Sequence, residues 1–95
     1  MVVTVQYLTA FDEITRKSGE KVELEEKATV GDLMSKLVDL YGTRFREIVF
    51  PQAPDKVGAL ISIMVKGTDV RLLSELNTQL NDGDSVMMAT IVMGG

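Results

Sequence analysis

The sequence predicts an α+β fold in which one amphipathic helix packs against a mixed sheet of four or five strands. Three observations support this prediction. Strand-like apolar runs occur near both ends of the chain and in its second half, and apolar residues recur at clear helical spacing over one long segment. Turn signals that contain Gly separate these runs. Because 95 residues suffice for one core of ordinary size, we expect a single domain over residues 1–95.

The first strand is predicted at residues 2–8, where apolar and polar side chains alternate from Val3 onward. Val3, Val5 and Tyr7 share one face, which we expect to line the core. Leu8 is then an apolar residue on a mostly polar face. It either lies under a loop or is exposed, where it would be available to a partner.

The next segment connects the first strand to a second one. Residues 9–19 are predicted to be a polar connection that closes with the turn signal Ser18-Gly19. Residues 21–25 alternate strictly, which predicts a strand half buried through Val22 and Leu24.

The helix is predicted to begin after Thr29, because Thr29 to Asp32 match a capping box with Asp in place of the usual Glu. Apolar residues follow at helical spacing, and Gly42 stands where a C-terminal cap is expected. These apolar residues are Val30, Leu33, Met34, Leu37, Val38 and Tyr41. The stripe is wide enough to cover one face of a sheet.

The second half of the chain contains the remaining strands. The expected segments are, in order, a weakly patterned region at 43–60, a strand at 60–66, a turn at 67–69, a short strand with an irregular or 3₁₀ segment at 70–80, a turn at 81–84 and a last strand at 85–93. The apolar residues of the weak region either extend a helix or pack as a plug; they are Phe45, Ile48, Val49 and Phe50.

The order of elements favours one topology. If the first and last strands are adjacent and central, the arrangement is the β-grasp, or ubiquitin-like, topology. A ferredoxin-like fold competes, but it requires a second full helix, and residues 70–80 are too polar and irregular to supply one.

Composition argues against several classes of function. The net charge of -4 and the scattered basic residues argue against nucleic acid as a partner. With no Cys and no His, the chain lacks the usual nucleophile, general base and metal ligands, so we expect no independent active site, bound cofactor or metal. No apolar stretch could span a bilayer and no secretion signal is visible, so we expect a cytoplasmic protein without a membrane partner.

Several segments resemble the small subunit of molybdopterin synthase and the related ubiquitin-like sulfur carriers. The matching segments are VTVQYL at the start, ATVGDLMSKLVDLYG at the helix, and VKGTDVRLLSELNTQLNDGDSV leading to a terminal Gly-Gly. The similarity covers nearly the whole chain and is least clear at residues 43–60. TVGDL and NDGD alone fit any helix start or tight turn, whereas their order before Gly94 and Gly95 is specific.

The resemblance implies that the reacting group is the C-terminal carboxylate of Gly95. In this family a ubiquitin-activating-type adenylating enzyme uses ATP and Mg to convert that carboxylate into an acyl-adenylate. A sulfur donor protein then displaces AMP and leaves a thiocarboxylate, which delivers sulfur in molybdopterin synthesis within the large subunit of molybdopterin synthase. Gly94 and Gly95 carry no side chains, so a flexible Gly-Gly tail can thread a narrow active site.

Two positions depart from the family pattern. Ala89-Thr90 stand where the family often carries Pro-Pro, and Lys66 replaces a common Asn. Because proline ends strands, its absence predicts a last strand that continues further and leaves a shorter free arm.

The apolar residues before the Gly-Gly pair also need partners. We expect Ile91 to stay in the sheet and Val92 and Met93 to dock against a partner protein. Leu8 and the exposed side of the last strand are the further residues expected at this partner surface.

Other functions remain compatible with the same terminus. A protein modifier would join its adenylated Gly95 to a lysine of a target, and carriers for thiazole or cysteine synthesis share the Gly-Gly end. A ubiquitin-like interaction module would not use the terminus at all. Extending the chain beyond Gly95 separates this last class from the others, because carboxyl chemistry requires a free terminus.

Overall fold

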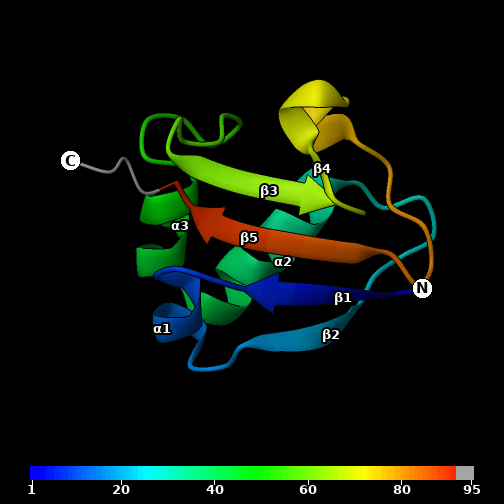
Figure 1. Cartoon of the computed structure of the whole chain (residues 1–95), viewed down its shortest axis with the longest axis horizontal. Helices are drawn as coiled ribbons and strands as arrows, with labels where there is room; N and C mark the ends of the chain where they lie inside the picture. The colour runs from blue at the N-terminus through cyan, green and yellow to red at the C-terminus, as the bar shows by residue number, and fades with distance from the viewer. Residues whose placement is uncertain (92–95) are drawn as a thin grey trace.

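The computed structural model describes residues 1–91 of the chain, in which a five-stranded sheet packs against helices (Figure 1). The strands are β1 (Val2–Tyr7), β2 (Gly19–Glu23), β3 (Ile61–Val65), β4 (Thr68–Asp69) and β5 (Ser85–Thr90). The helices are α1 (Phe11–Thr15), α2 (Val30–Tyr41) and α3 (Thr43–Val49), with short 3₁₀ segments η1 (Val70–Leu72) and η2 (Glu75–Asn77). Figure 1 shows α2 crossing behind the sheet, with α1 and α3 near the end from which the C-terminal segment leaves.

The strand order is β2-β1-β5-β3-β4, so the first and last strands are adjacent and central. They run parallel, with Thr4 opposite Ser85 and Tyr7 opposite Met88. The other strand pairs are antiparallel. A parallel pair needs a crossover connection, and here α2 lies on the path between the two strands. This is the predicted β-grasp topology, and the ferredoxin-like alternative is wrong.

The core lies between the sheet and α2. Val3, Val5 and Tyr7 are buried as the alternation of β1 predicts, and Val86 and Met88 are buried from β5. The helix contributes the predicted stripe, whose buried members are Val30, Leu33, Met34 and Leu37. Because a strand turns alternate side chains to opposite faces, the same strands leave their other residues on a face that none of the helices within residues 1–91 covers.

The ends of α2 form as the sequence predicts. Thr29 Oγ1 accepts a hydrogen bond from the Asp32 N–H (3.2 Å), and Asp32 Oδ2 accepts one from the Thr29 N–H (2.9 Å). At the other end Gly42 has φ +84°, and its N–H donates to the Val38 carbonyl. Two local signals therefore fix where the helix begins and ends.

One helix differs from the sequence predictions, and a second settles an alternative that the sequence left open. The segment expected as a polar connection contains α1, whose Phe11 and Thr15 are buried. The weak region after Gly42 contains α3, which buries Phe45 and Val49 at a spacing of four residues. Both helices are short, and the edge-to-face contact of Phe11 with Phe45 (centroids 5.6 Å apart) holds them together. Tertiary contact stabilises segments whose local signals are too weak to predict them.

The hairpin between β3 and β4 also corrects the prediction. Lys66 and Gly67 form the two-residue turn, with φ +52° and +82°, whereas Thr68 and Asp69 were expected in the turn and form β4. The short strand thus precedes residue 70, where η1 begins. The last strand ends at Thr90, shorter than the 85–93 expected.

Candidate functional site

The predicted reacting residues Gly94 and Gly95 lie outside the described residues, as do the predicted partner contacts Val92 and Met93. The structure does describe the surface from which this segment leaves the fold. That surface lies at the C-terminal end of β5, and its geometry determines where the last residues start.

Three hydrogen bonds hold the end of β5 from both sides. On one side the Leu8 N–H donates to the Met88 carbonyl (2.8 Å), and Thr90 Oγ1 donates to the Thr9 carbonyl (3.2 Å). On the other side the Ile91 N–H donates to the Leu60 carbonyl (2.6 Å). Ile91 is outside β5, but this bond continues the pairing with the segment before β3, in partial agreement with the prediction that Ile91 stays in the sheet. The terminal segment therefore begins from a fixed point.

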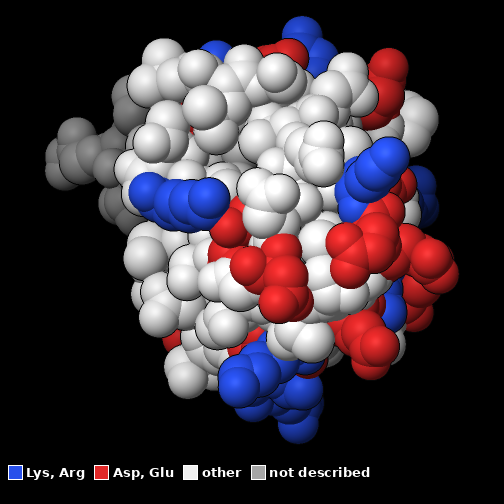
Figure 2. Space-filling model, turned by 90° about the vertical axis from the view of Figure 1, so that its right-hand side faces the viewer, with Lys and Arg blue, Asp and Glu red and all other residues white. Residues whose placement is uncertain are grey.

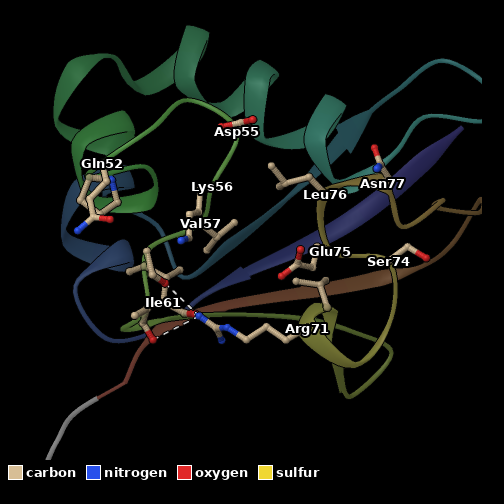
Figure 3. A pocket seen from close by; sticks show the side chains of 14 residues that line it. Gln52, Asp55, Lys56, Val57, Ile61, Arg71, Ser74, Glu75, Leu76 and Asn77 are labelled. Atoms are coloured by element: carbon tan, nitrogen blue, oxygen red, sulfur yellow. Dashed lines mark hydrogen bonds between the residues drawn. The ribbon is translucent and has the colours of Figure 1, made fainter.

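Arg71 braces the segment to which Ile91 is bonded. One guanidinium nitrogen lies 3.0, 3.3 and 2.6 Å from the carbonyl oxygens of Gly58, Ala59 and Ile61 (Figure 3). The other is 3.3 Å from the Asp69 carboxylate. Segment 58–61 is thus held by Arg71 on one side and β5 on the other. Sequence reasoning missed Arg71, because nothing local to η1 indicates which distant carbonyls its side chain reaches.

Figure 3 shows Arg71 at one end of a groove between the loop before β3 and the η1–η2 segment. The groove has a volume of ≈ 780 Å³ and carries both signs of charge, from Asp55 and Glu75 and from Lys56 and Arg71. The guanidinium is already bonded to main-chain carbonyls.

An apolar patch on the uncovered face of the sheet surrounds the end of β5. We call Leu8, Leu60, Met87 and Ile91 the open-face patch; they are 43%, 55%, 37% and 41% exposed. Strand pairing places these residues on neighbouring strands of the same face, with Ala89 between Met87 and Ile91 along the chain. Ile91 is bonded to Leu60, Met87 lies opposite Met64, and Leu8 is bonded to the residue after Met87. Leu8 and the exposed side of the last strand thus lie on one surface, and Leu60 joins it through strand register. Their contact with a partner stays a prediction.

The opposite end of the molecule is charged rather than apolar. Figure 2 views the end that bears the N-terminus and shows acidic side chains gathered there. Glu23, Glu25, Glu26 and Asp32 line one shallow hollow at this end, together with Lys36. The surface where β5 ends therefore carries exposed apolar residues, whereas the surface where β1 begins carries acidic ones.

The clearest perturbed titratable groups lie on the helix-covered side of the sheet. Glu20 accepts hydrogen bonds from Tyr7 Oη (2.6 Å) and Tyr41 Oη, and its carboxylate is 3.4 Å from Lys17 Nζ. Burial, then the hydrogen bond to Glu20, raises the pKa of Tyr7. Burial also raises the pKa of Glu20, but its hydrogen bonds from Tyr41, Tyr7 and Lys17 outweigh that effect and lower the pKa overall. This cluster ties β1, β2 and α2 together.

The described residues contain no grouping of three His, Cys, Asp or Glu side chains able to hold a metal ion. None of the helices within residues 1–91 is both long enough and apolar enough to cross a membrane. What residues 1–91 do supply is a hydrogen-bonded end of β5, from which the terminal segment starts, and exposed apolar residues near it.

Comparison with known proteins identifies the chain's relatives. The model of the ThiS family matches residues 5–95. The sulfur carrier protein CysO of Mycobacterium tuberculosis is 33% identical over 77 residues, which cover 81% of this chain and 83% of CysO.

Solved structures agree with the fold. A Pyrococcus furiosus protein named as a candidate subunit 1 of molybdopterin converting factor is 29% identical, with a TM-score of 0.78 over 97% of this chain and 99% of its own. Small archaeal modifier protein 1 of Haloferax volcanii shares the fold with a TM-score of 0.80 at 19% identity, over 96% of this chain and 98% of its own. With a family model that matches all but the first four residues, the chain belongs to the ThiS family of ubiquitin-like sulfur carriers.

Proposed function

We propose that this protein carries sulfur as a thiocarboxylate on Gly95 and donates it in molybdopterin synthesis, as the small subunit of the synthase. Membership of the ThiS family is the observation that carries this proposal. The chain has no Cys, so no side-chain thiol is available to hold a persulfide. A terminal carboxyl group is the remaining place for transferable sulfur.

The chemistry requires activation because a carboxylate is a poor electrophile. The Gly95 carboxylate attacks the α-phosphorus of ATP in an adenylating enzyme, which also supplies Mg, and pyrophosphate leaves. A sulfide-level nucleophile supplied by the sulfur donor protein then attacks the acyl carbon. The new C–S bond forms as the C–O bond to AMP breaks, AMP leaves with the bonding electrons, and loss of the proton on sulfur leaves the thiocarboxylate. Holding the terminus and the nucleotide in one site makes the first step effectively intramolecular.

The identity of the sulfur acceptor is the more specific part of the proposal. The similarity to the Pyrococcus furiosus protein supports a precursor of molybdopterin bound in the large synthase subunit. The relationship to CysO supports the carrier function itself without specifying this acceptor.

The first experiment is the intact mass of the protein isolated from its native host, followed by mapping of the C-terminal peptide. We expect a mass gain equal to replacing one oxygen by sulfur, located on Gly95. A Gly95 deletion, which leaves residues 1–91 unchanged, is expected to fold normally and to lack this modification. An unmodified terminus in the presence of the adenylating enzyme contradicts the proposal, and a Gly-Gly linkage to lysines of other proteins indicates a modifier instead.

A second experiment concerns the acceptor. The thiocarboxylated protein is mixed with the large subunit of molybdopterin synthase and the molybdopterin precursor. We expect conversion of the precursor and return of Gly95 to a carboxylate. Formation of the thiocarboxylate without any transfer to this precursor would retain the carrier function and remove molybdopterin synthesis from the proposal.

The open-face patch is the surface through which we expect the adenylating enzyme to bind, with Val92 and Met93 extending the contact. Leu8→Glu places a charge within this apolar surface. It should raise the KM for the carrier in adenylation about tenfold with kcat little changed. Leu72→Glu is the matched control, since Leu72 is 80% exposed in η1 and lies outside the patch. Equal kinetics for both variants would contradict this role.

A further inference from the structure

The sheet has an unpaired edge at β2, which is the terminal strand of the order β2-β1-β5-β3-β4. Figure 1 shows β2 along the lower side of the sheet, with no described strand beyond it. Such edges present unpaired main-chain groups and readily accept another strand.

The pairing with β1 fixes which groups of β2 point outward. Leu24 exchanges two hydrogen bonds with Met1, because the Leu24 N–H donates to the Met1 carbonyl (2.7 Å) and the Met1 amine donates to the Leu24 carbonyl (2.8 Å). In an antiparallel pair, every second residue of a strand directs its main-chain N–H and C=O toward the neighbouring strand, so Val22 and Glu20 also bond to β1. The main-chain groups of Gly19, Lys21 and Glu23 therefore point away from the sheet.

The side chains of these outward residues alternate in charge. Lys21 lies opposite Thr4 and Glu23 lies opposite Val2, so both side chains stand on the uncovered face of the sheet. Both residues are exposed. A strand that pairs with this edge therefore meets a basic and an acidic side chain two residues apart.

A second copy of the same strand complements this edge. In the antiparallel register that places Val22 opposite Val22, Lys21 of each copy lies opposite Glu23 of the other. That pairing forms two symmetric ion pairs and four main-chain hydrogen bonds. We propose that two copies of this protein pair antiparallel through β2, with a twofold axis at Val22, to form one continuous ten-stranded sheet.

Neighbouring registers are less favourable because of charge. In the next register on either side, the same outward main-chain groups still face each other. One of these registers places Lys21 opposite Lys21, and the other places Glu23 opposite Glu23. Like charges directly opposite each other are destabilising. The register centred on Val22 avoids both.

Charge outside the strand favours the same orientation. The acidic segment that follows β2 contains Glu25 and Glu26, at the acidic end of the molecule (Figure 2). Antiparallel pairing brings this segment beside the start of β2 in the second copy, where Arg16 and Lys17 lie. A parallel arrangement would place the two acidic segments together.

The helix beside β2 already contacts one of the outward groups through Lys36, so the new strand would share that group with Lys36. Lys36 Nζ lies 2.6 Å from the Glu23 carbonyl, so the side of α2 that bears Lys36 faces the β2 edge. Leu40 is one helical turn further along the same side and is 58% exposed. Leu40 is thus an apolar residue available to the second copy, and the Glu23 carbonyl retains a second lone pair for the new strand.

Sedimentation velocity over a concentration series at low ionic strength tests the pairing. The wild-type protein should dimerise, and Lys21→Glu should weaken dimerisation about tenfold because two ion pairs become like-charge contacts. The double variant Lys21→Glu with Glu23→Lys restores opposite charges in the same register and should recover the wild-type dimer. Lys56→Glu is the matched control for net charge, at a site remote from β2.

Amide hydrogen exchange locates the contact independently of the variants. Exchange at the Lys21 and Glu23 amides should slow as the protein concentration rises. A wild-type protein that stays monomeric to about 1 mM overturns the proposal, as does a double variant that fails to recover or concentration-dependent protection elsewhere. Binding of a foreign peptide to β2 by a protein that does not self-associate would likewise overturn it. None of these readouts uses the terminal glycines, so the result is separate from the sulfur-carrier proposal.

Discussion

The two faces of the central strands have different roles, although successive residues of the same strands form both of them. Met88 is fully buried against the helix side of the sheet, whereas its neighbour Met87 is 37% exposed on the other side. Val86 is buried like Met88, and Ile91 lies on the exposed surface with Met87. One face stabilises the fold, and the other carries exposed apolar residues of the open-face patch, which do not contribute to the core.

This difference shows how a small domain can carry both a core and a docking surface on one sheet. Burial of a side chain such as Met88 contributes about 1.5–3 kcal/mol to folding. An exposed apolar residue contributes little to folding but remains available to a partner. The open-face patch surrounds the end of β5, which is where a partner that acts on the terminus would need to bind.

The largest effect on stability is expected from the buried member of the methionine pair. Met88→Ala removes a core side chain and leaves a cavity, so we expect the free energy of unfolding to fall by about 2–5 kcal/mol. Urea denaturation followed by circular dichroism measures this loss. A loss below about 0.5 kcal/mol would show that Met88 does not fill the core as the structure indicates.

A smaller effect is expected from the carboxylate on the helix-covered side. Glu20→Gln keeps the shape but removes the charge that accepts from Tyr7 and Tyr41, and should destabilise the fold by about 1.5 kcal/mol at pH 7. The pKa of Glu20 is lowered in the folded state. Its charge therefore stabilises the fold fully above the unfolded carboxyl pKa of about 4.3, and this contribution is lost as the pH falls through the folded pKa.

Urea denaturation of the wild type and of Glu20→Gln over a range of acidic pH tests whether this stabilisation is lost on acidification. The stability difference between them should close as the pH falls below about 4. Glu25→Gln is the control, because Glu25 is exposed and outside the cluster. If the difference in free energy of unfolding between the wild type and Glu20→Gln stayed constant on acidification, the stabilising role of the Glu20 charge would be contradicted.

The smallest effect on stability is expected from the exposed member of the methionine pair. Met87→Ala should change the free energy of unfolding by less than about 0.5 kcal/mol. The same variant should weaken binding to the adenylating enzyme several-fold, which titration calorimetry would detect. If Met87→Ala destabilised the fold as much as Met88→Ala, the distinction between the two faces would be wrong.

Local signals in the sequence were sufficient for much of the fold. The alternation of β1 predicted its buried side chains, and the Thr29 capping box and Gly42 predicted the ends of α2. Strand periodicity and helix capping depend on residues a few positions apart, so sequence alone can specify them. The α+β class followed from these elements.

The helix α1 and the position of the β3–β4 turn were not predicted in the same way, and α3 was only one of two alternatives for its segment. The helices at residues 11–15 and 43–49 contact each other through Phe11 and Phe45, which are distant in sequence. Lys66 adopts a positive φ that a non-Gly residue rarely takes. In each case tertiary packing outweighs a weak or contrary local preference.

The sequence by itself determined which residues of β1 and α2 face the core and where the main helix begins and ends. Only the tertiary structure decided that Leu60 joins Leu8 and Met87 on one surface and that Arg71 braces the segment bonded to Ile91. The physical reason is distance along the chain. Side-chain alternation is a local property of the backbone, whereas strand register depends on packing the whole sheet against α2.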